Sequence, residues 1–106
     1  MLITTQDKLE EFVIERTLGL VRGNAVRARF FGKDIVAGLR NLVGGEVKEY
    51  TELMAQSREQ AIDRMVAEAQ KLGADAIVAV RLTTATISEA ASEQMAYGTA
   101  VKLRSL

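Results

Sequence analysis

The chain of 106 residues contains no cysteine, no histidine and no proline. Without cysteine and histidine it lacks disulfides, thiolate and imidazole metal ligands, cysteine nucleophiles and the commonest general base. Fourteen Lys and Arg balance fourteen Asp and Glu. The net positive charge of a protein that binds nucleic acid or an anionic membrane is therefore missing. We expect no cofactor, no nucleic-acid partner and no membrane partner.

Long hydrophobic runs are also missing. No apolar stretch reaches the roughly 18 residues of a membrane span. The pattern of a signal peptide, a basic segment followed by an apolar one, is also not seen. We therefore expect a cytoplasmic protein. The length fits one domain over residues 1–106. Zero net charge leaves self-association unopposed.

The most regular pattern is a helix predicted over Tyr50–Leu72. Gly73 suits the left-handed cap that ends such a helix, and Lys71 places a cation in its last turn. The next segment, Ala76–Val80, is apolar at every position. Both faces of this strand should be covered, by a second layer in this chain or in a partner chain. The predicted apolar stripe of the helix consists of Tyr50, Met54, Ala61, Met65, Ala69 and Leu72.

The remaining pattern predicts shorter elements around this unit. Strands are expected at Leu2–Thr5, at Phe12–Val21 with a kink near Gly19 and an end at Gly23 and Asn24, and at Met95–Leu103, and a helix at Phe31–Val43. The segment Ala25–Phe30 fits either a second strand or the lead into a helix. The last strand alternates larger residues with a face of small ones, which usually lies under a helix. The predicted fold is an α+β two-layer sandwich, β-α-α-β-β, with the long helix on a small, mainly antiparallel sheet.

Four segments stand out in this order: Gly19–Val26, the Gly44-Gly45 pair followed by Tyr50, Ala67–Val78 and Tyr97–Val101. Together they resemble the YbjQ-like family of small bacterial proteins. The resemblance covers nearly the whole chain. It implies a β-α-β-β subunit that assembles into a ring, typically a pentamer, with a heavy-metal-binding label and no established activity. The family usually has a basic and a small residue after the glycine pair, whereas this chain has Glu46 and Val47.

The residue types in the chain are poor ligands for the heavy metal that the family label implies. Soft metals prefer thiolate or imidazole, and the thioethers of Met54 and Met65 fall on the apolar stripe, where core packing is the simpler interpretation. A hard cation would need several carboxylates to converge; otherwise they are solvated or helix-terminal groups. We expect no metal site. The carboxylates considered are Asp34, Glu46, Glu49 and Asp75.

Arg58 falls on the apolar side of the predicted helix, where an arginine needs a carboxylate, an anion or a route to solvent. It either extends along the edge of the stripe or pairs across a subunit boundary. Arg40 and Tyr50 flank the Gly44-Gly45 pair. They either contribute to the same site as Arg58 at a subunit boundary or lie on the surface.

These residues favour a non-enzymatic homo-oligomer with a small-ligand or ion site at its subunit junctions, and the resemblance makes the oligomer a pentamer. Two alternatives stay open. One is the heavy-metal-binding protein of the family label. The other is a small enzyme that uses carboxylates, Tyr50 and arginine for acid–base chemistry.

Overall fold

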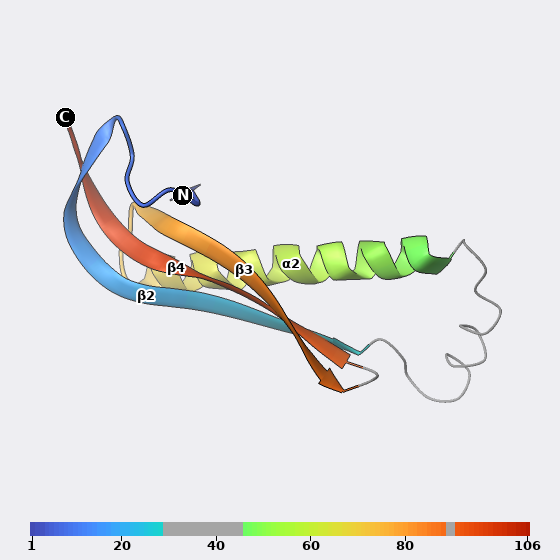
Figure 1. Ribbon diagram of the computed structural model, residues 1–106. Coiled ribbons are helices and arrows are strands. Elements are labelled where there is room, and N and C mark those ends of the chain that lie inside the picture. The colour runs from blue at the N-terminus through green and yellow to red at the C-terminus, as the bar shows by residue number, and fades with distance from the viewer. Residues whose placement is uncertain (29–45, 89–90) are drawn as a thin grey trace.

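The computed structural model describes residues 1–28, 46–88 and 91–106, with the side chains of 28, 46–50 and 88 left aside. In these ranges one helix lies on one face of a four-stranded sheet (Figure 1). The elements are β1 (Leu2–Ile3), β2 (Phe12–Ala28), α2 (Glu46–Lys71), β3 (Ala76–Ser88) and β4 (Ala91–Ser105). The predicted α+β class is confirmed. The predicted helix Phe31–Val43 lies outside the described residues.

The sheet is mixed and has the order β1-β3-β4-β2. The short β1 runs parallel to β3, whereas β4 is antiparallel to both β3 and β2. In the long β2–β4 ladder, Phe12 pairs with Ser105 and Ala28 with Ala91. The ladder shifts register between Ile14 and Arg16 and again between Thr17 and Gly19. The kink predicted near Gly19 is thus confirmed as one of two irregularities in a single strand.

The C-terminal end of α2 is closed by a Schellman motif. The Gly73 N–H donates to the Gln70 carbonyl at 3.0 Å and the Ala74 N–H to the Ala69 carbonyl at 3.1 Å. Gly73 has a φ of +77°, which glycine adopts without a Cβ clash. The predicted helix end is confirmed. Within the described residues, no helix is long and apolar enough to cross a membrane.

The helix crosses the sheet above β2 and β4. Ala61, Met65 and Ala69 are fully buried in this contact. The approach is closest at Gly23, where an added Cβ would lie 2.1 Å from the Ala61 carbonyl oxygen and 2.4 Å from the Met65 nitrogen. The prediction that Gly23 and Asn24 end the strand is wrong: β2 continues to Ala28, and Gly23 is the point where the helix backbone rests on it.

The apolar run of β3 is covered on both faces, as its pattern predicts. Ile77 and Val80 belong to the core under α2. On the other face, Ala76 and Val78 form a second small cluster with Val101. That cluster is covered by residues of the same chain, namely Leu9, Ile14 and Leu103. The run therefore needs no partner chain to cover it, and the argument for self-association from this run fails.

The N-terminal segment is hydrogen-bonded to β3 beyond the two residues of β1. The Thr4 N–H donates to the Ile77 carbonyl at 3.0 Å, and the Ala79 N–H donates to the Gln6 carbonyl at 2.7 Å. Ala79 lies where the β3–β4 register shifts and has a φ of +54°. The bulge thus turns β3 toward the N-terminal segment, which fixes both pieces of chain.

Candidate functional site

The structure brings few of the sequence-predicted site residues together. Arg40, Gly44 and Gly45 lie outside the described residues, and Tyr50 lies in α2 without a described side chain. Arg58 is exposed, because the buried stripe of the helix runs through Ser57 rather than through its neighbour. Its predicted place on the apolar side is therefore corrected, and a role at a subunit junction stays a prediction.

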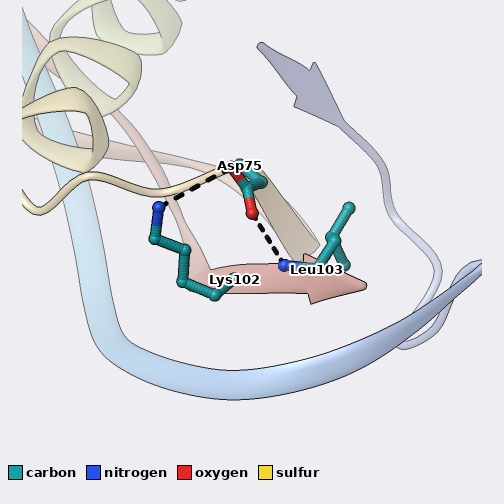
Figure 2. A network of polar contacts seen from close by, with 3 residues as sticks. All are labelled: Asp75, Lys102 and Leu103. Atoms are coloured by element: carbon teal, nitrogen blue, oxygen red, sulfur yellow. Dashed lines mark hydrogen bonds and ion pairs between the residues drawn. The ribbon is translucent and has the colours of Figure 1, made fainter. Parts of the chain in front are cut away.

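A polar network joins the start of β3 to the end of β4 (Figure 2). The Asp75 carboxylate accepts a hydrogen bond from the Leu103 N–H at 2.8 Å and lies 3.8 Å from the Lys102 Nζ. The Asp75 N–H also donates to the Val101 carbonyl at 2.9 Å. The carboxylate thus extends the β3–β4 ladder by one bond beyond Ala76, where the strand begins.

The surface beside this network is a shallow hollow with charges of both signs. Glu15 and Arg16 of β2 line it together with Asp75, Lys102 and Leu103. Two carboxylates and two cations offset one another, so the hollow has no net charge to attract an ion. Asp75 is already engaged by a backbone N–H and an ammonium group. We assign this place a structural role.

The donor groups do not fit a soft heavy metal. The sequence has no cysteine and no histidine, and no three carboxylates gather into a ligand set among the described residues. Of the carboxylates considered from the sequence, Asp75 is paired as above. Asp34 lies outside the described ranges, and the side chains of Glu46 and Glu49 are not described.

The sheet face opposite α2 has a different character in its far half. We call residues 20–28, 81–88 and 91–99 the distal sheet. Tyr97 stands directly opposite Arg22 on one side and Arg81 on the other, so the three side chains form one row on this open face. Arg81 is anchored there, since its Nη1 donates to the Thr5 carbonyl at 2.9 Å.

Large apolar side chains are exposed on the distal sheet. Leu20 and Val26 lie on the open face and are 64% and 51% exposed. Leu82 pairs with Ala96 and so lies on the α2 side of the sheet, where it is 48% exposed; Ile87, near the end of β3, is 57% exposed. Sequence reasoning missed this group, because the strand assignment gives the alternation of faces but not which face the helix covers. The outer edge of β3 beyond Arg81 also has no strand partner among the described elements. An open face, a free edge and exposed apolar groups together are the features of a protein–protein surface.

Comparison with known proteins places the chain among uncharacterised relatives. A family model named YbjQ and described as "Putative heavy-metal-binding" matches residues 1–104. A "UPF0145 protein" of Methanococcus vannielii is 55% identical over 98% of this chain and 99% of its own length. Another from Archaeoglobus fulgidus is 52% identical over 98% and 96%. Because these relatives are archaeal, the expected restriction to bacteria is wrong.

A solved structure supports the fold. The crystal structure of a protein of unknown function from Pediococcus pentosaceus, assigned to the DUF74 family, has a TM-score of 0.65 and 18% identity, covering 98% of each chain. At this identity the likeness concerns the fold alone. None of the relatives named above carries an enzyme name.

Proposed function

The chain belongs to the YbjQ family, whose members are also named UPF0145, and from this premise we propose that it is a non-enzymatic subunit that assembles with copies of itself into a ring. The observation that carries the proposal is the uncovered distal sheet. Four large apolar side chains there are about half exposed or more. A second copy is the partner that this surface fits, because the chain has no net charge to oppose self-association.

The two sides of the distal sheet favour a closed ring. The open face carries the row of Arg22, Tyr97 and Arg81, whereas the outer side of α2 exposes Glu52, Glu59 and Asp63. Two unlike, oppositely charged surfaces on one subunit make head-to-tail contacts, which close into a ring when the rotation permits. The resemblance to the family favours five subunits.

Light scattering or native mass spectrometry tests this assembly. We expect several times the chain mass at micromolar concentration. The substitution Leu20→Asp should shift the protein toward monomer with an unchanged far-UV spectrum, because it places a carboxylate in the apolar contact on the open face. Leu106→Asp, at a leucine that is 83% exposed outside the distal sheet, is the matched control. A monomeric parent protein would contradict the proposal.

We also propose that Arg58 lies at the junction between subunits, where it pairs with a carboxylate of the neighbour or with a small anion. In the single chain its side chain is exposed, so Arg58→Met should change the stability of the folded subunit by only about 0.5 kcal/mol. At a desolvated junction the loss of the charge should cost much more, about 3–5 kcal/mol. We therefore expect the variant to dissociate at dilutions where the parent stays assembled. Equal dissociation of both proteins would remove Arg58 from the junction.

A further inference from the structure

Three polar side chains are enclosed between the first half of α2 and the sheet. Ser57 is fully buried, Gln94 is 2% exposed, and Gln60 is half-buried. The Ser57 Oγ, the Gln60 Oε1 and the Gln94 Nε2 have no hydrogen-bond partner within the described protein. Buried polar atoms are nearly always paired with protein or with ordered water. Ser57 and Gln94, the two that are almost fully buried, therefore call for a partner.

The helix and the strand bring these groups face to face. The Ser92 Oγ contacts the Met54 Sδ at 3.5 Å, and Ala61 lies over Gly23, the register partner of Ala96. Ser57 is between the two contacts on the helix, and Gln94 is between them on the strand. One helical turn advances about 5.4 Å and two strand residues about 6.6 Å. Ser57 therefore lies over Gln94.

Gln94 is also hydrogen-bonded to β3. Its Oε1 accepts a hydrogen bond from the Thr84 Oγ1 at 2.8 Å, and its Nε2 has no partner within the described protein. The site then offers an amide donor from Gln94 and the hydroxyl of Ser57, which both donates and accepts. Both groups are neutral, so they suit a small neutral molecule rather than a metal ion or a phosphate.

We propose that Ser57 and Gln94 bind one structural water molecule that joins α2 to the sheet. The water accepts from the Gln94 amide and bonds with the Ser57 hydroxyl. Buried waters typically make two to four such bonds. The helix–sheet contact is thus hydrated in its first half and dry in its second, where Ala61, Met65 and Ala69 pack on the small residues of the sheet.

The melting temperature of Ser57→Ala tests the site, because a bridged hydroxyl and an orphaned one give opposite signs. If water satisfies the hydroxyl, the substitution breaks a network and should lower the melting temperature, by roughly 4–8 °C for a domain of this size. If the hydroxyl were an orphan, its removal would raise the melting temperature. Gln56→Leu, at an exposed glutamine on the same helix, should leave it unchanged.

A high-resolution crystal structure of the full chain is the second test, because it shows whether a water molecule occupies the site. We expect a single density peak within hydrogen-bond distance of the Ser57 Oγ and the Gln94 Nε2 in every copy. A direct bond between the two side chains without that peak would overturn the proposal. So would a buffer molecule in place of water, or a Ser57→Ala variant that melts higher than the parent.

Discussion

The smallest feature on which the fold depends is the missing side chain of Gly23. A Cβ there would lie 2.1 Å and 2.4 Å from backbone atoms of α2. Backbone atoms cannot rotate away as a flexible side chain can, so the helix would have to lift from the strand. We expect Gly23→Ala to destabilise the protein by about 1–3 kcal/mol, measured by urea unfolding.

Arg22→Ala is the control for this substitution. Arg22 is exposed on the opposite face of the same strand, so its replacement should change the free energy of unfolding by no more than about 0.5 kcal/mol. Equal unfolding midpoints for the two variants would show that the helix does not rest on Gly23.

Residue identity alone predicted some of these positions and misjudged others. Gly73 was predicted correctly, because a helix end needs a left-handed residue and the requirement is local. Gly23 was misjudged as a strand end, because its role is set by the helix that crosses it from a distant part of the chain. Arg58 was misplaced for a related reason: Ser57 is the buried residue of that turn, and a serine does not count toward an apolar stripe.

At the scale of elements, the Asp75 side chain joins β3 to β4 just beyond the last backbone pair of their ladder. Asp75→Ala should lose the bond to the Leu103 N–H and destabilise the protein by about 1 kcal/mol. Asp75→Asn keeps an acceptor oxygen and gives up only the exposed pair with Lys102, which contributes about 0–1 kcal/mol. Chemical denaturation should therefore rank the variants as parent, Asn and Ala. An Asn variant as unstable as the Ala variant would assign the effect to charge instead.

The long elements were predictable from local pattern, and their pairing was not. The helical period predicted most of α2, and the apolar run predicted the first part of β3. The small-residue face of β4 correctly indicated that a helix lies above it. Gly19 marks one of the two register shifts of β2 in the sequence, whereas the shift between Ile14 and Arg16 has no such mark, because bulges depend on the partner strand. The parallel pairing of β1 with β3 likewise depends on contacts between residues far apart in the chain.

At the scale of the whole molecule, the chemistry of the chain disagrees with the metal label of its family. With no thiolate and no imidazole in the sequence, zinc should bind no more tightly than to any acidic protein surface. Isothermal titration calorimetry on the assembled protein measures this directly. A stoichiometric zinc site of submicromolar affinity would contradict the expectation and support the label.

The pairing of β2 with β4 also sets an order of events during synthesis. The strand β2 is translated before α2, β3 and β4, yet its ladder partner is the last strand of the chain. Its ladder with β4 can therefore form only after the last strand has been made, whereas its contact with α2 can form earlier. Formation of this ladder is then the late step of folding. A substitution that acts only on the ladder should speed unfolding far more than it slows folding.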